Sequence, residues 1–151
     1  MKQKVCSTPI GWIKITEDQG FLVKLDLLDY KEDTGPYSFL LEETEKQLES
    51  YFKGELQKFD LPVKLSGTDF QERVWKALQN IPYGQTRSYK QLAEAIDNKK
   101  ASRAVGGANN KNPLPIIVPC HRVVGSSGDL VGYGLGLDIK KQLLALEGIE
   151  L

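Results

Sequence analysis

Short runs of apolar and β-branched residues, separated by turn residues, fill the first part of the chain. The runs read KVCST, GWIKIT and FLVKLDLL, and Pro9, Gly11 and the segment EDQG separate them. Strands of this length joined by such turns favour an antiparallel meander. From Pro36 to Gly54 the spacing becomes helical, which predicts one helix covering the sheet. Its expected core contacts are Phe39, Leu40, Leu48, Tyr51 and Phe52.

A second unit is expected after a segment without clear periodicity, at about residues 57–67. Thr68 with Gln71, and Ser88 with Gln91, fit the capping-box pattern, so each pair predicts the start of a helix. The first of these helices should run to about Asn80. Its expected buried residues are Phe70, Val74, Leu78 and one side of Trp75. The sequence therefore predicts a mixed α/β (α+β) protein with two domains, at residues 1–66 and 67–151.

Two short helices, over YKQLAEAI and ASRAVGGANN, are expected on either side of the polar turn DNKK. This arrangement is typical of a helix-turn-helix, although helical hairpins also occur in protein cores. Gly106 and Gly107 each cost about 1 kcal/mol relative to Ala inside a helix, which favours close approach of a nucleic-acid strand or a neighbouring helix. The tail should form an amphipathic helix that ends at Gly148. Its apolar residues are Leu137, Ile139, Leu143, Leu144 and Leu146.

Charge is balanced over the 151 residues but unevenly distributed along them. The net charge is zero, whereas residues 85–122 contain seven basic and two acidic side chains, a local charge of +5. This favours one basic face that binds nucleic acid, and a merely solvated, Lys-rich surface is the alternative. No targeting or membrane-spanning segment is expected, so we predict a location in the cytoplasm, or in the nucleus of a eukaryote.

The cysteine count argues against disulfides and metals. In an intracellular setting Cys6 and Cys120 are expected to stay free thiols. Two cysteines and one histidine do not suffice for the usual zinc sites, so we expect neither a metal nor another cofactor.

The segment PCHRV, which closes the apolar stretch PLPIIV, places Cys120 beside the only histidine, His121. A cysteine becomes a nucleophile when a neighbour lowers its pKa from about 8.5 or accepts its proton. Adjacent side chains point in different directions, so a bridging water would connect these two groups. Glu147 can hold the other ring nitrogen of His121 if the last helix packs across the site. A buried cysteine beside a histidine with satisfied hydrogen bonds is the alternative, and the residues alone leave both open.

The motifs PCHRV, NPLPIIV, SYKQLA, SRAVGGANNKNP, GYGLG and LLALEG occur here in an order that resembles the O6-alkylguanine-DNA alkyltransferases. The resemblance extends from about Phe70 to Gly148. It implies a ribonuclease-H-like N-terminal domain and a C-terminal winged helix-turn-helix-like domain that transfers the alkyl group. It further implies a monomer, able to cluster along DNA, that repairs O6-alkylguanine in duplex DNA, with O4-alkylthymine as a further candidate substrate.

The resemblance also implies roles for individual residues. Cys120 would accept the alkyl group, with His121 as its water-mediated base, Glu147 orienting His121, and Asn112 bracing the turn. Tyr89 would rotate the target nucleotide and donate to the guanine, while Arg103 would fill the gap left in the duplex. Expected DNA contacts are Tyr89, Ser102, Arg103, Gly106, Gly107, Lys111 and Arg122. Expected residues of the substrate pocket are Pro115, Val123, Tyr133, Gly134 and Leu135.

Three positions depart from the family pattern. Gly134 and Leu135 often correspond to Ser and Gly in relatives, so the shape of the pocket loop can differ. Asn109 stands where some relatives carry an apolar residue near the flipped base. Three functions follow as hypotheses: single-use alkyl transfer, a sensor that binds alkylated DNA, and a cysteine hydrolase that uses Cys120, His121 and Glu147.

Overall fold

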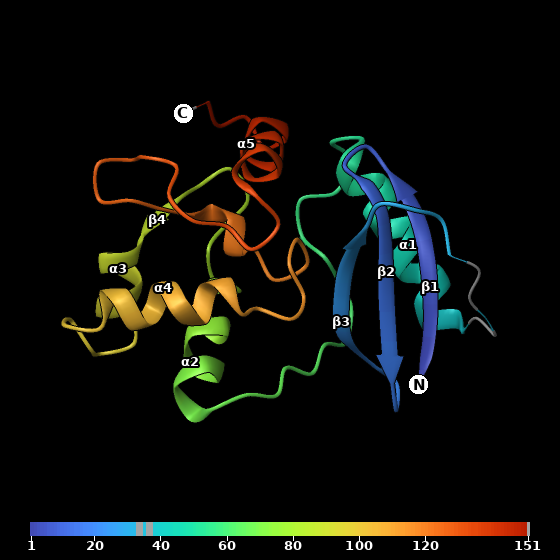
Figure 1. The fold of residues 1–151 in the computed structure, drawn as a ribbon, viewed down its shortest axis with the longest axis horizontal. Coiled ribbons are helices and arrows are strands. Elements are labelled where there is room, and N and C mark those ends of the chain that lie inside the picture. Colours follow the sequence, from blue (N-terminus) through green and yellow to red (C-terminus); the bar gives the residue numbers. More distant parts are fainter. Residues whose placement is uncertain (33–34, 36–37, 151) are drawn as a thin grey trace. The chain divides into compact units, whose positions relative to one another are not determined.

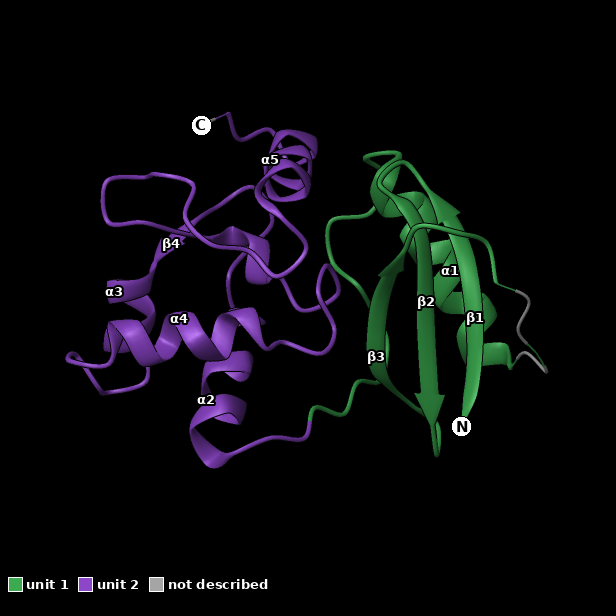
Figure 2. Ribbon diagram, in the orientation of Figure 1, with its two compact units in different colours: residues 1–65 green, residues 66–151 purple. Residues whose placement is uncertain are grey.

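The computed structural model of the protein describes residues 1–32, 35 and 38–150. These residues form two compact units, 1–65 and 66–151, which Figure 2 distinguishes by colour. The first unit combines a sheet with a helix, and the second is mainly helical, which confirms the predicted mixed α/β fold. Among the described residues, no helix is both long and apolar enough to cross a bilayer.

The sheet of the first unit is the predicted antiparallel meander. Strands β1 (Lys2–Thr8), β2 (Gly11–Asp18) and β3 (Phe21–Leu28) lie side by side in chain order (Figure 1). Side chains alternate between the two faces of a strand, so Ile13 and Ile15 of β2 share the buried face. Cys6 pairs with Ile13 across the ladder and is buried with it.

Helix α1 (Phe39–Phe52) packs against β1 and β2. It begins after Ser38, whose Oγ accepts a hydrogen bond from the amide of Leu41 at 3.1 Å. The residues that face the core are Leu41, Thr44, Leu48 and Tyr51. The expectation that Phe39 lies in the core is wrong, because Phe39 occupies the first helical position on the outer side and is 85% exposed. The predicted start at Pro36 lies outside the described residues.

Part of the expected linker is built into the first unit. The amide of Leu22 donates to the carbonyl of Pro62 at 2.9 Å, and the amide of Lys64 donates to the carbonyl of Leu22 at 3.0 Å. Val63 thereby forms a parallel bridge with β3. The segment looked like a plain connection because its partner strand lies about forty residues earlier, a separation that local pattern does not report.

The second unit begins with three helices, all close to the predicted positions. Helix α2 (Asp69–Leu78) and helix α3 (Tyr89–Ala95) both start with the expected capping boxes. Helix α4 (Ser102–Asn110) packs against both of them (Figure 1). The indole Nε1 of Trp75 on α2 donates to the carbonyl of Ala108 on α4 at 2.8 Å. This bond ties the pair α3–α4, the predicted helix-turn-helix, to the core of the unit.

The rest of the unit carries the PCHRV motif. A single 3-10 turn, η1 (Cys120–Arg122), leads into β5 (Val123–Val124), which pairs in parallel with β4 (Arg87–Ser88). Helix α5 (Leu137–Leu146) follows, and Gly148 with φ +86° closes its C-terminus, as predicted. Leu137 is 46% exposed, so its expected core position is wrong, because it is the first residue of the helix.

Candidate active site

The turn that presents Cys120 is braced by one side chain. Asn112 Nδ2 donates to the carbonyl of Val118 at 2.9 Å, and Asn112 Oδ1 accepts from the amide of Leu114 at 3.0 Å. The turn contains buried Ile116 with φ +76°, a conformation costly for a β-branched residue. The asparagine holds the backbone on both sides of this strained residue. Asn112 therefore bonds the backbone of this turn at two points, and its bracing role in alkyl transfer stays a prediction.

Cys120 itself is buried, with 3% of its surface exposed. Burial raises the pKa of its thiol, while hydrogen bonds to Asn112 and Tyr133 and the positive charge of Lys140 act in the opposite direction. The thiol is therefore neutral at rest. It lies among groups that would stabilise a negative charge on sulfur once a base removes the proton.

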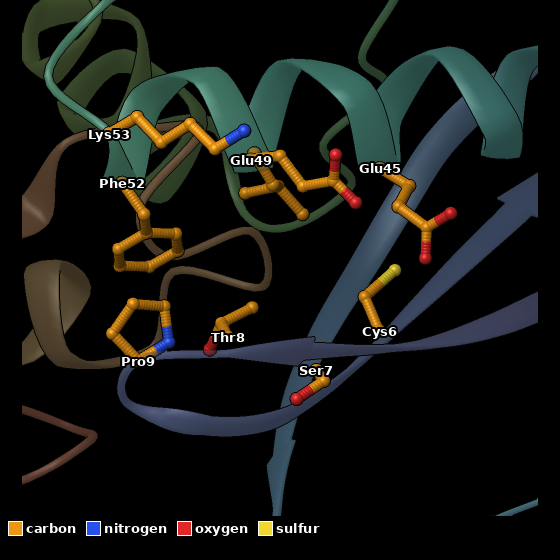
Figure 3. A pocket seen from close by; sticks show the side chains of 9 residues that line it. Cys6, Ser7, Thr8, Pro9, Glu45, Glu49, Phe52 and Lys53 are labelled. Carbon is orange, nitrogen blue, oxygen red and sulfur yellow. The ribbon is translucent and has the colours of Figure 1, made fainter.

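Cys6 has quite different surroundings. Its thiol lines a cavity of about 160 Å³ between β1 and α1 and points toward Glu45 (Figure 3). Burial and the carboxylate of Glu45 raise the pKa of Cys6 to about 12. Both effects disfavour the thiolate, so Cys6 is not a nucleophile near neutral pH.

His121 and Glu147 meet in the interior of the second unit. His121 Nε2 lies 2.6 Å from Glu147 Oε2, and neither side chain is exposed. Burial lowers the pKa of His121, whereas the hydrogen bond and negative charge of Glu147 oppose that shift. A neutral imidazole at this distance donates its Nε2–H to the carboxylate, which leaves Nδ1 as the basic nitrogen. His121 and Glu147 are thus in hydrogen-bond contact, and the orienting role of Glu147 in catalysis stays a prediction.

Arg122 completes this buried cluster. Its Nε donates to Glu147 Oε1 at 2.8 Å, its Nη2 to Glu147 Oε2 at 3.1 Å, and its Nη1 to the carbonyl of Ile81 at 2.7 Å. The amide of Gly84 also donates to Glu147 Oε1, at 3.1 Å. The expected DNA contact of Arg122 does not fit this placement, because the guanidinium is buried and faces Glu147 rather than solvent. Its positive charge is paired with Glu147 and helps to lower the pKa of His121.

The other expected DNA contacts lie at or near one surface. A cavity of about 440 Å³ is lined by residues of α3, α4 and the segment after β5, namely Tyr89, Lys90, Ser102, Arg103, Gly106, Gly125, Ser126, Val131 and Gly132. Arg103, Gly107 and Lys111 are exposed. A Cβ on Gly106 would contact the Tyr89 ring at 3.7 Å, and a Cβ on Gly107 would meet nothing within 4 Å. Gly107 therefore leaves its surface open to an approaching partner.

The expected pocket residues lie in two parts of the chain. Pro115 and Val123 belong to the segments around Cys120, whereas Tyr133, Gly134 and Leu135 belong to the segment before α5. Pro115 and Val123 are buried near the turn, and Tyr133 lies close enough to Cys120 to lower the pKa of its thiol. Gly134 packs beside α4, where an added Cβ would lie 3.2 Å from the carbonyl of Asn110. Tyr89 Oη donates to the carbonyl of Val131 at 3.0 Å. Tyr89 thus bonds the segment that carries Tyr133, and Leu135 on the same segment is half-buried.

One residue at the site was missed from the sequence, and a second makes a contact that the sequence did not predict. Lys140 is completely buried and donates to the carbonyls of Val131 and Gly132, at 3.0 and 3.2 Å. Asn109 Nδ2 donates to the carbonyl of Cys120 at 3.3 Å. Lys140 had a signal, since it lies three and four residues before Leu143 and Leu144, on the apolar side of α5. Asn109 was noted only as a departure from the family pattern, and its bond to the carbonyl of Cys120 had no local signal, because a polar residue late in a helix fits a solvated surface equally well. Among the described residues, no group of three or more His, Cys, Asp and Glu can hold a metal ion.

Comparison with known proteins assigns the family. The ribonuclease-like domain of 6-O-methylguanine DNA methyltransferase matches residues 1–65, and the DNA binding domain of the same family matches residues 69–149. A methylated-DNA–protein-cysteine methyltransferase of Methanosarcina acetivorans is 48% identical over an alignment of 154 positions that covers 98% of this chain and 99% of that protein. Its counterpart in Mycolicibacterium paratuberculosis is 47% identical and covers 97% of this chain and 92% of its own.

Solved structures agree with these sequence matches. The structure of Mycobacterium tuberculosis OGT in complex with DNA is 45% identical with a TM-score of 0.89, covering 97% of this chain and 92% of that one. An O6-methylguanine DNA methyltransferase from Methanococcus jannaschii is 28% identical with a TM-score of 0.70, covering 98% and 95%. The resemblance inferred from the motifs is confirmed, and the chain belongs to the 6-O-methylguanine DNA methyltransferase family.

Proposed function

We propose that this protein repairs O6-alkylguanine in duplex DNA by transferring the alkyl group to its own Cys120, once per molecule. The observation that carries the proposal is the buried arrangement of Cys120, His121 and Glu147 within a chain of this family. The thiol lies beside a histidine that is held as a neutral base, and hydrogen-bond donors surround the sulfur. This is the machinery that an activated cysteine requires.

The chemistry is a displacement at a saturated carbon. The thiol proton passes through a water to His121 Nδ1, the sulfur bonds to the alkyl carbon, and the carbon–oxygen bond breaks. The electron pair of that bond stays on the guanine, which takes up a proton in balance with the one lost by the thiol and remains in the DNA as an unmodified base. Tyr89 would turn its O–H from the carbonyl of Val131 to the base and donate to it as negative charge develops. The product is a thioether without a carbonyl for water to attack, so the thiol is not regenerated.

Because Cys120 is buried, the alkylated base has to leave the duplex and enter the protein to reach the sulfur. The O6 substituent lies inside the stacked duplex, and turning the nucleotide out costs a few kcal/mol. Exposed Arg103, on α4 at the edge of the 440 Å³ cavity, would fill the gap in the duplex. Lys90 on the same cavity and Lys111 at the end of α4 would contact phosphates. We further infer that the protein acts as a monomer on DNA and works in the cytoplasm.

The test is a count of methyl groups. The protein is incubated with an excess of duplex containing one O6-methylguanine, and the intact mass and the repaired guanine are measured together. We expect one methyl per protein, repair that stops at equimolar amount, and the same result for Cys6→Ala. Repair that continues past one equivalent would contradict the proposal and indicate hydrolysis. Binding without any added mass would also contradict it and indicate a sensor.

A further inference from the structure

The amide side chain of Asn109, on α4, is buried beside the proposed acceptor. Asn109 is 1% exposed, and its Nδ2 donates to the carbonyl of Cys120 at 3.3 Å. A carbonyl can only accept, so this bond fixes which end of the amide is nitrogen and which is oxygen. Among the residues that the structure describes, none donates to Asn109 Oδ1. The side chain therefore presents a buried acceptor in a fixed orientation.

An acceptor of this kind is unfavourable in the resting protein. Nearly all buried polar atoms have a hydrogen-bond partner, and one without a partner has lost its water shell without compensation. A leucine at position 109 would fill the same interior without an unpaired oxygen, and leucine is the better helix former. The bond to the Cys120 backbone accounts for the nitrogen of Asn109 only. The oxygen indicates a donor that arrives with the substrate.

The end of α4 contacts both the Cys120 turn and the segment of the expected pocket. Asn109 bonds the Cys120 backbone. The carbonyl of the next residue, Asn110, would lie 3.2 Å from a Cβ on Gly134. Cys120 is 3% exposed, so a base that brings its alkyl carbon to the sulfur has to enter the interior that contains the Asn109 amide. The edge of that base then comes within reach of Asn109 Oδ1.

A guanine alkylated at O6 has one kind of donor on the edge that carries its alkyl group. Alkylation leaves N1 without a hydrogen, so the exocyclic amine at C2 is the remaining donor on that edge. A base that has been turned out of the duplex is read by hydrogen bonds to this edge. The amine therefore complements the oxygen of Asn109. Hypoxanthine alkylated at O6 has the same ring system and the same leaving group but no amine.

We propose that Asn109 is a specificity-determining residue, whose Oδ1 accepts a hydrogen bond from the exocyclic amine of the alkylated guanine while its Nδ2 stays on the Cys120 carbonyl. The inference rests on the proposed transfer to Cys120. A base without the amine leaves Asn109 Oδ1 unpaired and forgoes the bond that guanine gains, so the site favours guanine.

The experiment compares two duplexes that differ by one amino group, with O6-methylguanine or O6-methylhypoxanthine opposite cytosine. Single-turnover methyl transfer is measured for the wild-type protein, Asn109→Leu and Asn109→Asp, with exposed Asn80→Leu as the matched control. We expect the wild-type protein to react about tenfold or more faster with the guanine lesion, and Asn109→Leu to reduce this preference to about twofold or less. Asn109→Asp keeps an acceptor and should keep a preference, and Asn80→Leu should match the wild-type protein. Any loss that Asn109→Leu causes through the Cys120 backbone slows both reactions and cancels in the ratio.

Two results would overturn the inference. One is a wild-type preference near one, which requires no variant to fold. The other is a wild-type preference that persists in Asn109→Leu, or in Asn109→Ala if the leucine variant does not fold. If the wild-type protein takes up no methyl from either duplex, the proposed function has failed. The affinities of Cys120→Ala for the two duplexes then still test the contact, because equal affinities would contradict it and tighter binding of the guanine lesion would support it.

Discussion

The two cysteines differ in what surrounds their sulfur atoms, and that difference selects the nucleophile. Cys6 faces the carboxylate of Glu45, which disfavours a thiolate. Cys120 faces hydrogen-bond donors and the ammonium of Lys140, which favour it. Both thiols are buried, so exposure alone would not separate them. The two thiols are distinguished by the sign of the nearby charge, which is negative at Cys6 and positive at Cys120.

The neutral state assigned to His121 has a consequence for stability at acid pH. Because the folded pKa of His121 lies below its ordinary value of 6.5, the unfolded chain binds a proton that the folded protein does not. The free energy of unfolding should therefore fall as the pH drops below about 6.5. Urea denaturation between pH 7 and pH 5 should show a loss of about 1–2 kcal/mol that is absent from His121→Gln.

The opposite sign is just as informative. If His121 were protonated in an ion pair with Glu147, its pKa would be raised, and the wild-type protein would gain stability relative to His121→Gln as the pH falls. That result would contradict the assignment of His121 as a base that is ready to accept a proton.

Helix α5 and the turn η1 are joined by the carboxylate of Glu147. It accepts hydrogen bonds from Arg122 and from the amide of Gly84, and it contacts His121. A buried carboxylate needs such partners, because it has lost its water shell. The cluster therefore connects three segments that lie far apart in sequence, and it fixes the imidazole in one orientation.

This arrangement predicts that Arg122 acts on folding rather than on DNA. Arg122→Met should cost about 3–5 kcal/mol of unfolding free energy, because it leaves a buried carboxylate without its partner. It should not change the slope of DNA affinity against salt concentration. The matched control is exposed Lys111→Met, which should change stability by less than about 0.5 kcal/mol and reduce the slope by about one ion. A reduced salt slope for Arg122→Met would show that its guanidinium reaches phosphate.

Local signals predicted the elements well and their long-range partners poorly. The capping boxes at Thr68 and Ser88 gave the starts of α2 and α3, because the relevant hydrogen bonds are made within four residues. The bridge of Val63 to β3 and the ion pair of Arg122 with Glu147 were not predicted, because the partners are remote in the chain. The pairing of His121 with Glu147 was anticipated only on the condition that the last helix packs across the site, which no local pattern establishes.

The molecule as a whole carries no net charge, yet its basic residues are concentrated at residues 85–122. With Arg122 buried, the basic side chains left on the exposed surface include Lys90, Arg103 and Lys111. Such a face would attract the phosphate backbone without regard to sequence. A protein that must search DNA for rare damage can use this property.

A variant of Arg103 can distinguish opening of the duplex from the alkyl transfer itself. Arg103→Ala should slow repair of O6-methylguanine duplex by about tenfold or more, because the cost of turning out the nucleotide is no longer offset. Its reaction with free O6-benzylguanine should be nearly unchanged, since no duplex has to open. Exposed Lys99→Ala is the control, and both rates follow from quenched time courses. An equal loss in both reactions would place Arg103 in the chemical step instead.

The most direct test of the account is to find the atom that receives the alkyl group. The protein is reacted with duplex that carries O6-methylguanine labelled in the methyl group, digested, and mapped by mass spectrometry. The account predicts the label on the peptide with Cys120 and none on the peptide with Cys6, with all transfer lost in Cys120→Ala. Label on any other residue, or transfer that persists in Cys120→Ala, would contradict it.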